Sequence, residues 1–161
     1  MDASARLCAA LADLPSALDS LPQPERRRAH NLIARAADED QDGWRSILVE
    51  LMDRPMDLGW TTNSRALAYL LDERRTGRLR AWRQGAGSPS AEQQARLRML
   101  WLIVELDELM PGGGVLQGVR VEGNSPRNRY GFGLIDLLRQ GDYELIAELA
   151  AKQLASSSSL A

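Results

Sequence analysis

The segment from Asn63 to Leu100 constrains the fold of this chain most, because its apolar residues follow two helical patterns with one break between them. The first pattern is an apolar stripe at helical spacing, with Thr62 or Asn63 in position to cap its N-terminus. The stripe consists of Leu67, Ala68, Leu70 and Leu71. It breaks over Asp72–Thr76 and restarts at Leu79 and Trp82. Two short helices joined in this way predict a helix-turn-helix, whose second helix would lie in the major groove of DNA.

A further helix is expected directly after this motif. Gly85, Gly87 and Pro89 end the second helix, and Ser90 followed by Glu92 is typical of a helix N-terminus. Leu97, Leu100 and Trp101 then return at helical spacing. These residues would close a small core over the two preceding helices.

The charge of this segment differs from that of the whole chain, which has a formal net charge of −2. Between Arg65 and Arg98, eight arginines stand against Asp72, Glu73 and Glu92, a local formal charge of +5. A basic island in an acidic protein is typical of phosphate contact. The residues predicted to contact DNA are Arg75, Thr76, Arg78, Arg80 and Arg83. The alternative is a solvated helical face, which would leave a protein-interaction module that does not bind DNA.

The segment resembles an Xre-type helix-turn-helix in its helix ALAYLL, its LRAW and RQG sequences and its continuation SPSAEQQARLRML. Asp72 stands where that family usually has Gly, and the spacing from Asp72 to Trp82 is one residue longer than usual. The resemblance implies two helices and a DNA-binding role.

The C-terminal third resembles the toxin-binding domain of Xre/MbcA/ParS-type antitoxins. The similar pieces are RMLWLIVELDELM (98–110), GFGLIDLLRQGD (131–142) and the closing helix from Tyr143 to Leu154. Leu134 replaces the family's usual Pro, and the expected Trp in the preceding loop is missing. The resemblance implies an antitoxin that covers the active site of a protein toxin, often of the RES type, and represses its own operon.

The segment Pro111–Arg129 is rich in glycine and proline around a short strand-like VRV, and predicts a long loop or a small hairpin. Its polar residues and the adjacent Tyr130, together with the GFGLIDLLRQGD helix, would form the partner-binding surface, because loop-borne polar groups often carry recognition. These residues are Arg120, Asn124, Arg127, Arg129 and Tyr130. The alternative is that they only solubilise a long loop.

The remaining patterns predict an all-α protein. Amphipathic helices are expected at Ala3–Leu14, Glu25–Ala37, 44–52, Gly133–Arg139 and Tyr143–Leu154, with a disordered tail at Ala155–Ala161. The predicted regions are an N-terminal helical region (1–55), a DNA-binding region (56–98), a partner-binding region (99–154) and the tail (155–161). Because these helices offer more apolar surface than one small core obviously buries, we expect a homodimer or a second chain.

Other chemistry is disfavoured by the sequence. Asp38, Asp40, Asp42 and Gly43 match the start of a Ca²⁺ loop, but its twelfth position is Val49 where a bidentate Glu is needed, so an acidic helix-capping loop is expected. One cysteine, Cys8, and one histidine, His30, exclude a His/Cys zinc cluster. No nucleophile and base pair stands out, so we expect no enzyme, cofactor or metal.

The N-terminus lacks a basic stretch followed by an apolar one, so no secretion signal is predicted. The longest strongly apolar run, Met99–Val104, is far shorter than the roughly 20 residues of a membrane span. These patterns predict a cytoplasmic protein.

Overall fold

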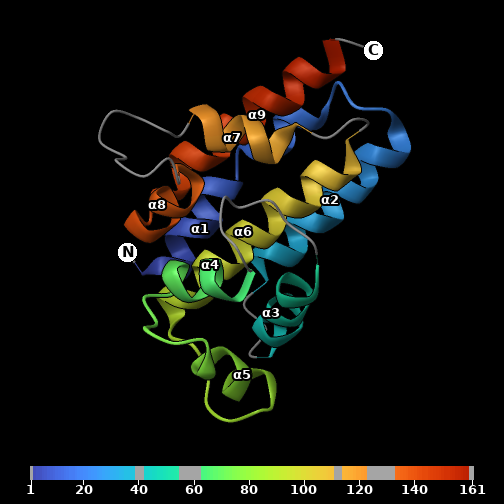
Figure 1. Cartoon of the computed structure of the whole chain (residues 1–161). Coiled ribbons are helices and arrows are strands. Elements are labelled where there is room, and N and C mark those ends of the chain that lie inside the picture. Colours follow the sequence, from blue (N-terminus) through green and yellow to red (C-terminus); the bar gives the residue numbers. More distant parts are fainter. Residues whose placement is uncertain (1, 39–41, 55–62, 111–113, 123–132, 160–161) are drawn as a thin grey trace.

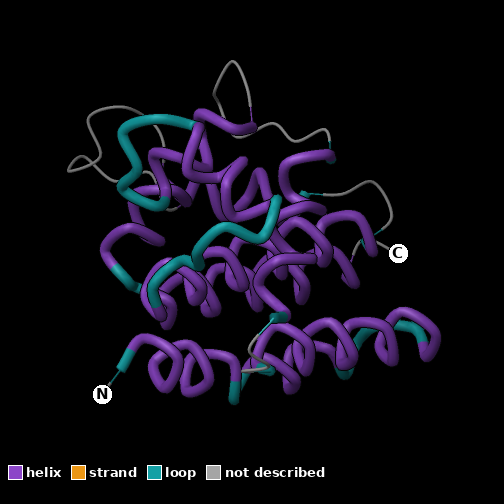
Figure 2. The backbone as a smooth tube through the Cα atoms, turned by 90° about the horizontal axis from the view of Figure 1, so that it is seen from below, coloured by secondary structure: helices purple, strands orange, loops and turns teal. Residues whose placement is uncertain are grey.

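The computed structural model describes residues 2–38, 42–54, 63–110, 114–122 and 133–159, without the side chains of 120–122 and 157–159. The helices are α1 (Ala3–Leu11), the 3-10 helix η1 (Leu14–Leu18), α2 (Gln23–Ala37), α3 (Gly43–Asp53), α4 (Asn63–Leu70), α5 (Gly77–Arg83), α6 (Ala91–Leu109), α7 (Val115–Glu122), α8 (Gly133–Gln140) and α9 (Tyr143–Ser159). Over these residues the fold is entirely helical, without a strand, which confirms the predicted all-α class (Figures 1 and 2).

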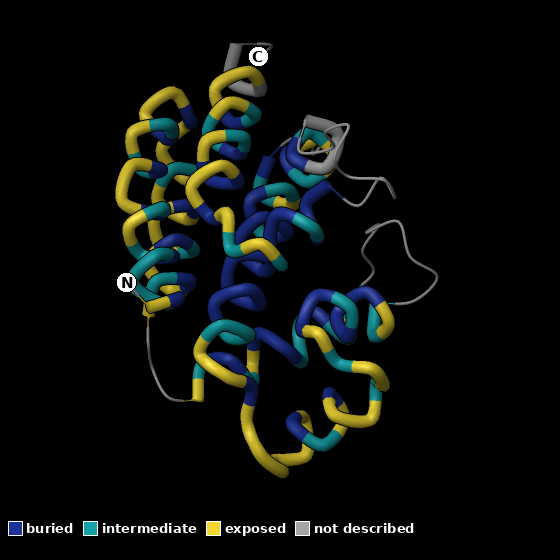
Figure 3. Tube along the Cα trace, turned by 90° about the vertical axis from the view of Figure 1, so that its left-hand side faces the viewer, coloured by how far each residue is buried: buried dark blue, intermediate teal, exposed yellow. Residues whose placement is uncertain are grey.

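Helix α6 is the central element of the fold. Every residue from Ala95 to Val104 is buried, and α1, α2, α3, α7 and α8 all pack against this helix. Figure 3 shows the buried positions concentrated along it, with exposed positions on the surrounding helices. A helix that is buried on every side has no polar face, which is why the sequence of α6 shows an apolar run in place of a stripe.

The start of α6 is fixed by its own first residues. The Gln93 amide donates to the Ser90 hydroxyl at 3.2 Å, and the Ser90 amide donates to the Gln93 side chain at 2.8 Å. This reciprocal arrangement is a capping box, which satisfies two amides that the helix leaves unpaired. The predicted helix start at Ser90 is confirmed.

The first predicted helix, Ala3–Leu14, is divided in the structure. Helix α1 ends at Leu11, and the 3-10 helix η1 carries the chain from Leu14. Pro15 lies in the first turn of η1, where its missing amide does no harm, whereas it could not continue α1.

The long loop or small hairpin predicted around VRV is wrong at these residues, because they belong to helix α7. The Asp107 carboxylate accepts hydrogen bonds from the amides of Gly114 and Leu116, both at 2.9 Å, and so satisfies the amides at the start of α7. Val115 and Val119, four residues apart, are both buried. Burial of this helical stripe overrides the strand preference of valine.

The disordered tail predicted from Ala155 is also wrong as far as Ser159, where α9 ends. Leu154 is fully buried and anchors this part of the helix. Serine is only a moderately poor helix former, so a serine run can extend a helix that tertiary contacts have already nucleated.

The described helices share one hydrophobic core. Leu7 of α1, Leu48 of α3, Leu67 of α4, Ile103 of α6 and Ile146 of α9 all belong to the same buried cluster. The region boundary predicted at residue 98 falls within α6. The three predicted regions that precede the tail therefore meet in this core.

Substitution of a leucine in the central helix tests this architecture. Leu102 of α6 is fully buried, and we expect Leu102→Ala to lower the free energy of unfolding by about 2–5 kcal/mol, because it removes buried methyl groups and leaves a cavity. The matched control is Leu145→Ala on α9, where the leucine is 36% exposed. Urea unfolding followed by circular dichroism measures both, and equal losses would contradict a central α6.

Candidate nucleic-acid interface

Helix α5 lies at one end of the molecule, at the bottom of Figure 1, and packs against α3. The Leu79 and Trp82 side chains of α5 are buried, so the apolar residues that recur at helical spacing in the sequence form the buried face of this helix. The Arg83 guanidinium forms a bidentate ion pair with Asp53 at the end of α3, at 2.8 and 2.9 Å. Arg83, which was predicted to contact DNA, therefore ties α5 to α3 in this structure.

The other four predicted contact residues run from the connection before α5 to its last turn, where Arg80 lies. Thr76 is its N-cap residue and is half-buried, whereas Arg75, Arg78 and Arg80 are exposed. Arg80 donates a long hydrogen bond of 3.4 Å to the Thr76 hydroxyl, and Arg78 lies 3.8 Å from Glu73. Arg75 makes no ion pair or side-chain hydrogen bond with the part of the chain that the structure describes. Arg78 and Arg80 are held only by these long contacts, so all three exposed guanidinium groups can reach a phosphate or a base edge.

Arg96 and Arg98 contribute nothing to the surface charge, because both are buried, at 7% and 4% exposed. The local charge of +5 counted from the sequence therefore exceeds the positive charge that faces solvent. Helical period alone could not reveal this, since α6 has no polar face on which arginines would be expected.

The connection between α4 and α5 runs over residues 71–76, which is longer than the usual three or four residues of a helix-turn-helix. Its second residue, Asp72, has a φ of 58°, in the left-handed region. The Glu73 amide donates to the Ala68 carbonyl at 2.9 Å and the Asp72 amide donates to the Tyr69 carbonyl at 3.3 Å, which is a Schellman motif. Glycine usually occupies this position because it has no Cβ to clash, so Asp72 needs compensation from elsewhere.

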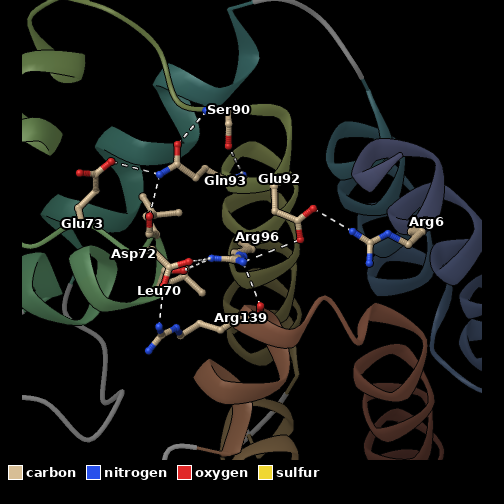
Figure 4. Close-up of polar contacts among 10 residues, drawn as sticks. Arg6, Leu70, Asp72, Glu73, Ser90, Glu92, Gln93, Arg96 and Arg139 are labelled. Carbon is tan, nitrogen blue, oxygen red and sulfur yellow. Dashed lines mark hydrogen bonds and ion pairs between the residues drawn. The ribbon is translucent and has the colours of Figure 1, made fainter. Parts of the chain in front are cut away.

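Arg96 supplies that compensation from inside the fold (Figure 4). Its guanidinium donates to the Asp72 carboxylate at 3.0 Å and to the Leu70 carbonyl, at the C-terminal end of α4, at 2.9 Å. The same group donates to the Arg139 carbonyl, near the C-terminal end of α8, at 2.9 Å. A cation is favourable where two helices present unpaired carbonyls. Arg96 thus joins α4, α6 and α8.

Arg139 holds the second oxygen of the Asp72 carboxylate. Its guanidinium also lies over the Tyr69 ring, 4.0 Å from the ring centroid. Partial burial alone would raise the pKa of Asp72, but the hydrogen bonds and charges of Arg96 and Arg139 outweigh burial and hold this pKa below its usual value.

A groove between α1 and α9, with a volume of about 520 Å³, is a feature that sequence reasoning missed. Tyr143 lines it and is almost completely buried. Its hydroxyl makes no hydrogen bond of normal geometry within the described residues, although the charged groups of Glu92 and Arg96 lie nearby. Burial and then the charge of Glu92 raise the pKa of Tyr143 to about 12, so the hydroxyl stays neutral.

The structure does not describe the side chains of the predicted partner-binding residues. Arg120 belongs to α7, but its side chain is not described, and Asn124, Arg127, Arg129 and Tyr130 lie outside the described residues.

The acidic loop, Cys8 and His30 form no further site in the described residues. Asp42 is the N-cap residue of α3 but its side chain makes no capping hydrogen bond, and residues 39–41 of the acidic loop lie outside the described chain. Cys8 makes a long contact of 3.6 Å from its thiol to the Ala37 carbonyl, and His30 is exposed. Within the described ranges, no three side chains of the metal-binding types come together, and no helix combines the length and apolarity of a membrane span.

No protein-family model, curated protein sequence or solved structure matches this chain. The likeness to Xre-type antitoxins therefore rests on the sequence motifs quoted above.

The Asp72 ion pairs predict a pH-dependent contribution to stability. Asp72→Asn keeps the size and the left-handed backbone preference but removes the charge. Because Asp72 is half-exposed, we expect a loss of only about 1 kcal/mol in the free energy of unfolding at pH 6.

The sign of the pH effect follows from the lowered pKa of Asp72. The stabilisation is complete above the unfolded value of about 3.9 and is lost as the pH falls through the folded pKa. We therefore expect the difference between the wild type and Asp72→Asn to be constant from pH 5 to 7 and to shrink below about pH 4. Urea unfolding at a series of pH values measures it, and a difference that grows towards acid pH would contradict the ion pairs.

Proposed function

We propose that this chain is a DNA-binding regulator that contacts DNA through α5 and the connection before it. The observation that carries this proposal is the exposure of Arg75, Arg78 and Arg80 along this segment, at one end of the molecule. Arginine supplies many of the contacts to phosphate oxygens in protein–DNA complexes.

The arginines would have different tasks. Arg75 precedes α5, in the position of a phosphate contact that sets the register of the helix on the duplex. Arg78 and Arg80 lie within α5 and are candidates for base contacts in the major groove, where arginine pairs with guanine. Arg83 would act indirectly, because its ion pair with Asp53 positions α5 on α3.

The second half of the proposal is that the protein is an antitoxin, which neutralises a protein toxin and represses its own operon. It is supported by the two sequence resemblances, one at the helix-turn-helix and one across the C-terminal third. Repressors of this kind bind paired half-sites as dimers, so a homodimer is part of the proposal.

A protein-interaction module without DNA binding is the second candidate. The long connection between α4 and α5 and the internal use of Arg96 and Arg98 favour it, since both reduce the likeness to a DNA-reading motif. Such a module would keep the helical scaffold but would not bind an operator.

Arginine substitutions distinguish these candidates. Arg78→Ala or Arg80→Ala is expected to weaken binding to the protein's own promoter by about 1–3 kcal/mol and to relax sequence preference if the arginine reads guanine. If it contacts phosphate, all DNA should bind more weakly and the salt dependence should flatten. Electrophoretic shift over a salt series measures both.

The matched control is Arg27→Ala, an exposed arginine on α2, whose removal should leave binding unchanged. Wild-type protein that shifts no fragment of its own locus at low salt would favour the interaction module.

Co-expression with the neighbouring gene product tests the antitoxin proposal. A truncation after Leu109 is unsuitable, because α7, α8 and α9 contribute Val119, Leu134 and Ile146 to the common core. We expect the full-length chain to rescue growth from a toxic neighbour. The double variant Arg78→Ala and Arg80→Ala should rescue equally while operon expression rises. A harmless neighbour, or no rescue by the folded wild-type chain, would contradict the assignment.

A further inference from the structure

The groove between α1 and α9 has an apolar floor, most of which is alanine. Ala9, Ala10 and Leu14 contribute from the N-terminal side, and Ala147 and Ala151 from α9. The lining residues of α9 run from 143 to 151, a length of about 12 Å along a helix. A groove of this length and of about 520 Å³ accommodates several side chains of one partner segment.

The rim of the groove is acidic. Asp13, Asp142, Glu144 and Glu148 line it and are all exposed. None of the four carboxylates forms an ion pair within the described residues. The one cation of the lining, Arg6, is already engaged by Glu92 of α6 at 2.8 Å.

Unpaired carboxylates beside an apolar floor favour one kind of occupant. Arginine and lysine combine an aliphatic stem, which packs on small apolar side chains, with a cationic head for a carboxylate. An acidic segment would be repelled by the rim, and a purely apolar one would leave the rim without a counter-charge.

We propose that the α1–α9 groove binds a basic, amphipathic segment of a partner protein, with aliphatic stems on the alanine floor and cationic heads on the acidic rim. The groove provides a protein-binding surface separate from α5, and the inference does not depend on DNA binding.

The test uses the full chain and a synthetic probe. The probe is a fluorescent twelve-residue helical peptide of alanine, leucine and four arginines, and the reference peptide has glutamate in place of each arginine. We expect the basic peptide to raise the fluorescence anisotropy, the acidic peptide to leave it unchanged, and added salt to weaken the binding.

The chain offers a matched pair of substitutions on either side of η1. Asp13 at its N-terminus lines the groove, whereas Asp19 at its C-terminus does not, and both are exposed. We expect Asp13→Lys to weaken peptide binding about tenfold and Asp19→Lys to change it less than about twofold, because only the first reverses a rim charge.

A second variant, Ala9→Phe, adds bulk to the apolar lining at a solvent-exposed helical position without changing charge, and should weaken binding as Asp13→Lys does. Circular dichroism checks that each variant is folded. The proposal fails if the basic peptide does not bind, or if Asp13→Lys and Asp19→Lys act equally. It also fails if sedimentation shows a homodimer that Asp13→Lys dissociates, since a second copy would then occupy the groove.

Discussion

The described arrangement of helices depends on the hydrogen bonds of one buried guanidinium group, that of Arg96. It caps the C-terminal end of α4 through the Leu70 carbonyl and that of α8 through the Arg139 carbonyl, and it pairs with Asp72. A buried cation is costly unless acceptors surround it. Here two carbonyls and a carboxylate accept from the two terminal nitrogens of Arg96, whereas its Nε has no acceptor within the described residues. Because these acceptors come from α4, from the connection after it and from α8, the cost is offset only in this arrangement.

The same network determines the conformation that leads into the proposed interface. Asp72 occupies a left-handed position that glycine would adopt without strain, and two arginines hold its carboxylate there. The start of α5 therefore depends on charges that lie on α6 and α8. Beyond it, the Arg83–Asp53 ion pair and the buried Trp82 fasten α5 to α3.

The surface charges distinguish two candidate binding surfaces on the molecule. Exposed arginines lie on α5 and in the connection before it, whereas unpaired carboxylates such as Glu144 and Glu148 border the α1–α9 groove. Opposite charges on separate surfaces favour ligands of opposite charge, which is the basis of the two binding proposals.

The sequence by itself determined the helical class, the two short helices around Leu67 and Leu79, and the capped start at Ser90, because local spacing and capping chemistry act over a few residues. Tertiary structure decided the rest. Burial of one face made the valine-rich segment around Val119 a helix. Packing on all sides of α6 buried Arg96, so this arginine does not add to the positive charge that faces solvent. The acidic groove joins segments from opposite ends of the chain, and such a juxtaposition has no periodic signal in the sequence.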